Sequence, residues 1–159
     1  MSQRVLIIDD EDHVRQMMRL ALETSGYEVG EAPDGSEGLK IYGDGSGWNA
    51  VVLDQRMPGM DGLETLRRLR AANPSTRIIM ATAYASIELA VDAMKLGASD
   101  FVRKPMTPEA LRNAVRRRPG QEDRAAASSQ GFSRTKRGTH VAWNRQNDNI
   151  EWVLNSGRG

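Results

Sequence analysis

Carboxylates follow two apolar runs of the sequence, each at the point where a buried strand would end. Asp9 and Asp10 come directly after residues 5–8, and Asp54 comes directly after residues 50–53. Ligands of a doubly wound parallel sheet bind outside the carboxyl ends of its strands, so these acids converge if the two strands are neighbours. Each pair of carboxylates would then repel by about 1–4 kcal/mol. A hard divalent cation such as Mg²⁺, which prefers oxygen ligands, would offset that repulsion.

Each acid taken alone also has a purely structural explanation. Asp54 could simply end its strand, since the turn residues Pro58 and Gly59 follow it, and Asp9 or Asp10 could cap the next helix. That explanation accounts for one acid at a time. It does not account for three acids on two strands.

Two further polar residues end apolar runs in the same way. Thr82 ends residues 77–82, and Lys104 follows residues 99–103. Singly, these are an ordinary strand-end residue and a solvated charge. With the three acids they predict a phosphoryl site, in which a metal and a lysine neutralise the oxygen charge. Nucleotide hydrolysis is poorly supported, because the sequence has no glycine-rich P-loop and no serine–histidine pair.

Ten alternating segments must position these residues. The strand pattern occurs at residues 5–8, 27–29, 50–53, 77–82 and 99–103, and the helical pattern at 12–25, 34–42, 61–72, 87–96 and 108–118. Strand–helix alternation predicts an α/β fold, a five-stranded parallel sheet with helices on both faces. The three most apolar strands should be central and residues 27–29 at an edge. In the first helix the spacing places four residues on the buried face, Val14, Met17, Met18 and Ala21.

The composition is that of an ordinary globular protein. The 159 residues carry a net charge of +1, are 39% hydrophobic and include no cysteine, which excludes disulfides and thiolate chemistry. The N-terminal apolar run is too short for a signal peptide or a membrane span. We expect a cytoplasmic protein without membrane contact.

The helical and strand periodicity stops after Arg118. We expect residues 1–118 to form one domain, 119–137 a linker and 138–159 a small extension. Two strand-like runs, 139–143 and 150–154, predict a β-hairpin, which would be marginal alone and would need another surface.

The residues at the strand ends, in their order and spacing, resemble the receiver domain of two-component response regulators over residues 3 to about 118. The match consists of Asp9-Asp10, Asp54 with the segment Met57-Pro58-Gly59-Met60-Asp61-Gly62, Thr82-Ala83 and Lys104-Pro105. The local sequence around Thr82 and Lys104 is similar to that of receivers of nitrogen-regulatory type. The resemblance implies a flavodoxin-like fold with strand order 2-1-3-4-5.

The resemblance also implies a set of roles around Mg²⁺. Asp54 is the implied phosphoacceptor, which takes its phosphoryl group from the phosphohistidine of a sensor histidine kinase or phosphotransfer protein. Asp10, Asp54 and the backbone carbonyl of Arg56 would bind Mg²⁺ directly, and Asp9 largely through water. Lys104 would pair with the phosphoryl oxygens.

A conformational switch is implied as well. Thr82 would move toward the phosphoryl group, and Phe101 would turn inward into the space that it vacates. Lys104-Pro105 matches the family's cis peptide. The surface of helix 87–96, strand 99–103 and helix 108–118 would then change shape, bind a downstream effector and mediate a homodimer.

The implied function is phosphoacceptor signalling, with transcription regulation as one possible output, by a protein that assists only its own phosphorylation and dephosphorylation and is not an enzyme. A nucleic-acid-binding tail is an alternative, with contacts at Arg134, Lys136, Arg137, Trp143, Arg145 and Trp152. Six basic residues among the last 41 make a weak footprint, so binding of nucleic acid through this chain alone is not favoured. A Mg²⁺-dependent phosphatase is a third reading, but no separate general acid is evident for it.

Overall fold

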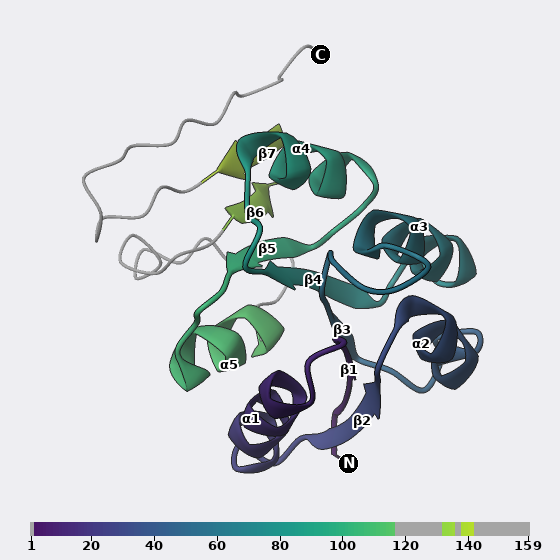
Figure 1. Cartoon of the computed structure of the whole chain (residues 1–159), viewed down its shortest axis with the longest axis vertical. Coiled ribbons are helices and arrows are strands. Elements are labelled where there is room, and N and C mark those ends of the chain that lie inside the picture. The colour runs from purple at the N-terminus through teal and green to yellow at the C-terminus, as the bar shows by residue number, and fades with distance from the viewer. Residues whose placement is uncertain (1, 117–131, 136–137, 142–159) are drawn as a thin grey trace.

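Five parallel strands form the central sheet of the molecule (Figure 1). The structure is a computed structural model and describes residues 2–116, 132–135 and 138–141. The parallel strands lie in the order β2-β1-β3-β4-β5. Their bounds are β1 (Arg4–Ile8), β2 (Glu28–Ala32), β3 (Ala50–Leu53), β4 (Arg77–Thr82) and β5 (Asp100–Arg103). The strand order is the expected one, with the three most apolar strands at the centre and β2 at an edge.

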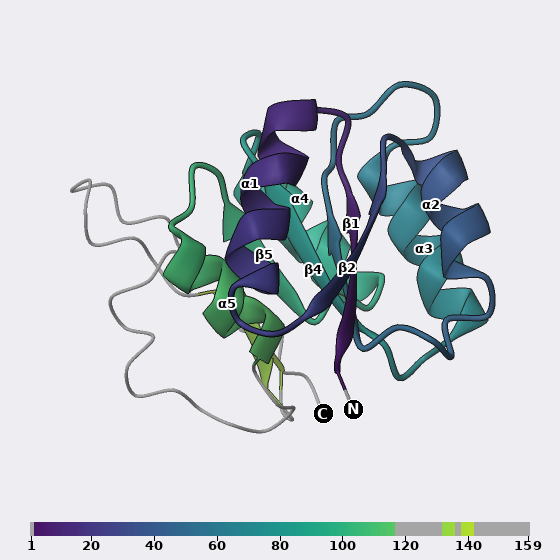
Figure 2. The same ribbon diagram turned by 90° about the horizontal axis from the view of Figure 1, so that it is seen from below.

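Helices cover both faces of this sheet (Figure 2). They are α1 (Asp12–Glu23), α2 (Gly35–Tyr42), α3 (Gly62–Ala72), α4 (Ile87–Lys95) and α5 (Pro108–Arg116). Successive strand side chains point to opposite faces, so Val5 and Ile7 pack with α1 and α5, whereas Leu6 and Ile8 pack with the helices on the other face, α2, α3 and α4. The predicted α/β fold with a doubly wound sheet is confirmed.

Short polar side chains begin three of the helices. Asp34, Asp61 and Ser86 each accept a hydrogen bond from the backbone N–H three residues later, at the starts of α2, α3 and α4. Such a cap stabilises a helix by about 1 kcal/mol. The cap at Asp61 matters most here, because it fixes the helix that follows the Asp54 loop.

The buried face of α1 differs from the predicted one. Met18 and Ala21 are buried as expected, but Met17 is 62% exposed, and Leu22, which was not predicted, is fully buried. A buried face made of residues 18, 21 and 22 fits the helical period as well as the predicted face, which included residue 17. The position of α5 beside α1 selects between them.

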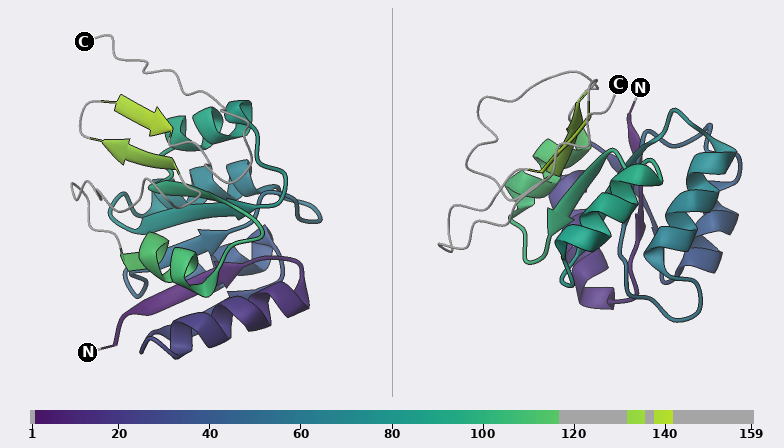
Figure 3. Two further views of the ribbon diagram at one scale, coloured as in Figure 1. Left: turned by 90° about the vertical axis from the view of Figure 1, so that its left-hand side faces the viewer. Right: turned by 90° about the horizontal axis from the view of Figure 1, so that it is seen from above.

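The sheet continues beyond β5 into an antiparallel hairpin (Figure 3). Its strands are β6 (Phe132–Thr135), which pairs with β5, and β7 (Gly138–Val141), which pairs with β6. β7 overlaps the first run of the predicted hairpin, residues 139–143, and its partner 132–135 falls in the expected linker. The second run, 150–154, lies outside the described residues, as do 117–131, so its pairing with 139–143 stays a prediction. A two-residue connection favours the closer partner.

The described helices are short. The longest, α1, has 12 residues, whereas a bilayer requires about 20. None of them is long and apolar enough to cross a membrane.

Candidate functional site

Three carboxylates meet at the carboxyl edge of the sheet. β1 and β3 are direct neighbours with Ile8 opposite Leu53, so Asp9 and Asp10 at the end of β1 lie beside Asp54 at the end of β3. One carboxylate oxygen from each acid lies within 4.8 Å of the others. Asp9 and Asp54 are buried, while Asp10 is exposed. The convergence that was predicted from the strand ends is present.

Lys104 approaches the same carboxylates from β5. Its Nζ donates a hydrogen bond to Asp9 Oδ2 and lies 3.6 Å from Asp54 Oδ1. Its backbone N–H donates to the Thr82 carbonyl (2.9 Å), which fixes the start of this loop against β4. One ammonium therefore faces two buried carboxylates with a third beside them, so the cluster carries net negative charge.

Burial raises the pKa of Asp54 to about 6. Lys104 opposes the shift, Asp9 and Asp10 add to it by repulsion, and the Gln55 N–H, which donates to Asp54 Oδ1 (2.9 Å), opposes it. The carboxylate is thus held in a charged form that its surroundings only partly stabilise.

The loop after Asp54 is folded back tightly on the strand. A Cβ at Gly62 would lie 2.3 Å from the Asp54 carbonyl oxygen, so this position requires glycine. The Gly62 N–H donates to the Gln55 carbonyl (2.9 Å), and Gln55 Oε1 accepts from the Leu63 N–H (2.9 Å). In the sequence Gly62 stood out only as the last residue of the segment that resembles the receiver family. The structure shows that it sets the distance between α3 and Asp54.

Two loops join beside the carboxylates through Tyr84. Its N–H donates to Oγ1 of the fully buried Thr82 (3.1 Å), and its ring lies 3.7 Å from the guanidinium carbon of Arg56. The loop that carries the Arg56 carbonyl is therefore stacked on the loop after β4. Tyr84 was missed from the sequence, because nothing local to either loop predicts this contact.

The remaining two predicted residues lie on and after β5. Phe101 is fully buried and stands opposite Met80 of β4. The Lys104–Pro105 peptide bond is cis, as the resemblance implies. Phe101 thus occupies an inward position in this structure.

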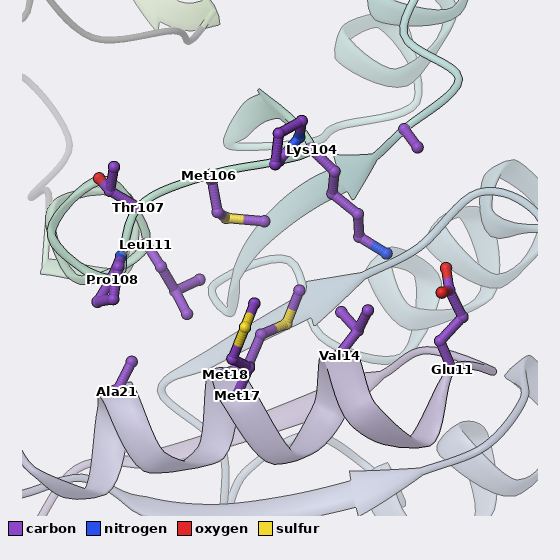
Figure 4. A pocket seen from close by; sticks show the side chains of 12 residues that line it. Glu11, Val14, Met17, Met18, Ala21, Lys104, Met106, Thr107, Pro108 and Leu111 are labelled. Carbon is purple, nitrogen blue, oxygen red and sulfur yellow. The ribbon is translucent and has the colours of Figure 1, made fainter.

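A mainly apolar hollow of about 360 Å³ opens next to Lys104 (Figure 4). Residues of α1, of the loop after β5 and of α5 line it, and Glu11 stands at its rim near Lys104. Met17, Met18 and Met106 supply much of its wall. The exposed Met17 of α1 therefore belongs to a surface beside the acidic cluster.

The tail residues considered as nucleic-acid contacts are scarcely described. Arg134 lies in β6. Lys136, Arg137, Trp143, Arg145 and Trp152 lie outside the described residues.

A doubly wound sheet with three acids and a lysine gathered at its carboxyl edge defines a receiver-type signalling domain. The sequence model of the family described as "Response regulator receiver domain" matches residues 5–116. The chain therefore belongs to this family of two-component response regulators.

Named relatives agree with this assignment. Regulatory protein AtoC of Escherichia coli (strain K12) is 40% identical over 114 residues, which cover 72% of this chain and 24% of AtoC. The uncharacterized transcriptional regulatory protein YkoG of Bacillus subtilis (strain 168) is 40% identical over 112 residues, 70% of this chain and 49% of YkoG. The chain thus spans about a quarter of the length of one of these curated relatives and about half of the other.

A similar solved structure carries a modified site. It is a response regulator protein from Burkholderia pseudomallei with a phosphorylated aspartic acid, calcium ion and citrate. It superposes with a TM-score of 0.67 at 31% identity and covers 72% of this chain and 67% of its own.

Proposed function

We propose that Asp54 accepts a phosphoryl group and that this modification is the input signal of the protein. The observation that carries the proposal is the position of Asp54: a buried carboxylate at a strand end, 3.6 Å from Lys104 and grouped with two further acids. The phosphorylated aspartic acid of the Burkholderia relative supports it.

Asp54 has the ionisation that a nucleophile needs. A carboxyl with a pKa of about 6 is mostly ionised at neutral pH, yet it is more basic than an ordinary aspartate. Its oxygen would bond to the phosphorus of a phosphohistidine while the phosphorus–nitrogen bond breaks. The electron pair stays on the imidazole, which takes up a proton. The product is an acyl phosphate on Asp54.

The acidic cluster fits Mg²⁺. Hard divalent cations bind carboxylate and carbonyl oxygens, and the cluster offers oxygens of Asp9, Asp10 and Asp54, with the Arg56 carbonyl in the adjoining loop. We propose that Asp10, Asp54 and the Arg56 carbonyl hold the ion and that Asp9 contacts it through water. Bound Mg²⁺ would offset the repulsion among the acids and the charge on the phosphoryl oxygens.

The remaining polar groups act on the phosphoryl oxygens. Lys104 is already within reach of Asp54 and would pair with one oxygen. Thr82 Oγ1 accepts a hydrogen bond from Tyr84, so its own proton remains available to donate to another. These groups would assist the transfer of one phosphoryl group onto Asp54 and its later removal. We therefore propose a phosphoacceptor that promotes its own modification and does not turn over a separate substrate.

We propose a histidine kinase or phosphotransfer protein as the phosphoryl donor. The apolar hollow lies directly beside Lys104, so a protein that packs on α1 and α5 would place a histidine near Asp54. Exposed methionines adapt to an incoming surface, and Met17 is suited to this role.

The output that we propose is control of transcription through the α4–β5–α5 surface. One relative is described as a transcriptional regulatory protein and another as a regulatory protein. Phosphorylation adds nearly two negative charges at Asp54. Movement of Thr82 toward them, with Phe101 filling the space behind it, would alter that surface. A switch from 1:99 to 99:1 requires about 5.5 kcal/mol of differential stabilisation.

Acetyl phosphate with Mg²⁺ tests the proposal. The wild-type chain should gain one phosphoryl group by intact-mass spectrometry, and Asp54→Asn should gain none. Asp92→Asn, at an exposed position on α4, is the matched control and should be modified like the wild type. Modification of Asp54→Asn to the wild-type extent would refute the assignment.

A further inference from the structure

β5 would be an open edge of the sheet without the hairpin. The Lys104 N–H donates to the Thr82 carbonyl of β4, and backbone groups of a strand alternate in direction. The C=O group of Phe101 and the N–H and C=O groups of Arg103 therefore face away from β4, while the Phe101 N–H donates to Asp100 Oδ1 (2.9 Å). Such a row of backbone groups is a ready template for pairing with another strand.

The hairpin occupies this edge. β6 runs antiparallel to β5, with Asp100 opposite Ser133 and Phe101 opposite Phe132. β7 pairs with β6 over four positions, from Phe132↔Val141 to Thr135↔Gly138. The views of the molecule agree that β6 and β7 extend the sheet past β5 (Figures 1 and 3). Every other pairing in the sheet is parallel.

The chain is long enough to reach this edge from its own α5. Fifteen residues separate Arg116 from Phe132. They can span up to about 50 Å when extended, whereas the nine residues of α5 rise by only about 14 Å. Return along α5 to the beginning of β6 therefore requires no second copy of the chain.

The hairpin depends on β5 and is held by few contacts. Two strands of four residues are marginal alone in water, and a third strand makes them stable. Only two residue pairs join β6 to β5, whereas four join β3 to β4. The contact is therefore much weaker than those of the parallel sheet, and a competing strand could replace it.

We propose that the β5 edge is a strand-docking surface and that β6 and β7 of the same chain, residues 132–135 and 138–141, are its resident occupant. A partner or second copy that adds a strand to this edge must first displace the hairpin. The expected homodimer and effector surface, formed by α4, β5 and α5, is thus covered along β5 by the chain itself. This inference does not depend on the role of Asp54.

Nuclear magnetic resonance of the full chain tests the pairing directly. We expect backbone contacts between Phe101 and Phe132 and between Ser133 and His140. In an equal mixture of differently labelled chains these contacts should arise within one chain. Absence of the contacts, or contacts only between chains, would overturn the proposal.

Ser133→Pro is the matching variant, because an interior strand position facing two neighbours tolerates no proline. Slowly exchanging amides of β6 and β7 should exchange at least about tenfold faster in Ser133→Pro. Ser129→Pro, earlier in the tail, should leave them unchanged. Protection of β1 and β3 and acetyl phosphate modification of Asp54 should be unchanged in both variants. Equal exchange in the two variants, or loss of protection throughout the sheet, would contradict a peripheral hairpin.

Discussion

Asp54 and Glu64 are both carboxylates that lie beside basic side chains, but Asp54 is buried at the end of β3 whereas Glu64 is only partly buried on α3. Glu64 on α3 accepts hydrogen bonds from Arg67 (2.6 Å) and Arg68 (2.9 Å), and these bonds lower its pKa to about 2. Asp54 lies 3.6 Å from Lys104, yet burial raises its pKa to about 6. A carboxylate beside a basic side chain therefore has a lowered pKa on the surface of α3 and a raised pKa at the buried strand end.

The difference shows what distinguishes a site from a surface ion pair. The arginines beside Glu64 are more than half exposed, so water solvates all three charges whether or not they pair. At the strand ends Asp9 and Asp54 are buried from water, and one lysine must compensate both of them. Burial makes the charged form of Asp54 costly, and this difference from Glu64 is the reason that we propose Asp54 as the phosphoacceptor.

Removal of Lys104 should have the largest effect. In Lys104→Met the buried carboxylates of Asp9 and Asp54 lose their cation. We expect the free energy of unfolding without Mg²⁺ to fall by about 3–5 kcal/mol, measured by urea denaturation at neutral pH. Arg67→Met removes a cation from Glu64 in the same way and should cause no measurable loss. Similar losses in the two variants would contradict the comparison.

Mg²⁺ should stabilise the protein through the cluster of Asp9, Asp10 and Asp54 and not through Glu64. At a hundredfold excess over its dissociation constant it should raise the free energy of unfolding by about 2.7 kcal/mol. Asp10→Asn and Asp54→Asn should lose most of this gain, because each removes a carboxylate from the cluster. Glu64→Gln should keep it. Undiminished stabilisation of Asp54→Asn, measured by thermal denaturation with and without Mg²⁺, would argue against this cluster as the metal site.

A smaller effect is expected from pH, because solvent at the exposed side of the cluster screens part of the charge. The pKa of Asp54 rises from 3.8 in the unfolded chain to about 6 in the folded one. Between these values the folded state keeps a proton that the unfolded state releases, so stability falls as pH rises through this window. In metal-free buffer the melting temperature of Asp54→Asn should therefore gain on that of the wild type from pH 4 to pH 6. Glu64→Gln should show no such gain over the same range, since the pKa of Glu64 is shifted downward.

The smallest expected effect concerns the stack of Arg56 on Tyr84. A cation–π contact at an exposed site contributes about 0.5–1 kcal/mol, and this one holds the loop that carries the Arg56 carbonyl. We expect Tyr84→Ala to weaken Mg²⁺ binding about two- to fivefold by isothermal titration calorimetry. Tyr84→Phe keeps the ring and should bind like the wild type. Equal affinities of the two variants would show that the stack does not position the carbonyl.

Local sequence determined where the strands end and which residues stand there. Short apolar runs followed by acids, a threonine and a lysine specify both a buried strand and a polar end, because each depends only on neighbouring residues. The caps at Asp34, Asp61 and Ser86 are local for the same reason. Five strands, five helices and the polar residues at the strand ends could therefore be predicted, but Tyr84 could not.

Only the tertiary structure decided which of these residues meet. Ile8 opposite Leu53 brings Asp9 and Asp10 to Asp54, and no local pattern states that β1 and β3 are neighbours. The tertiary structure also decided that Leu22 and not Met17 is buried in the core, and that Tyr84 stacks on Arg56. It likewise decided that β6 pairs with β5. Each of these contacts joins segments that are adjacent only after the chain has folded, or depends on a surface that folding creates. Burial likewise exists only in the folded state, and it is burial that raises the pKa of Asp54 above that of an ordinary aspartate.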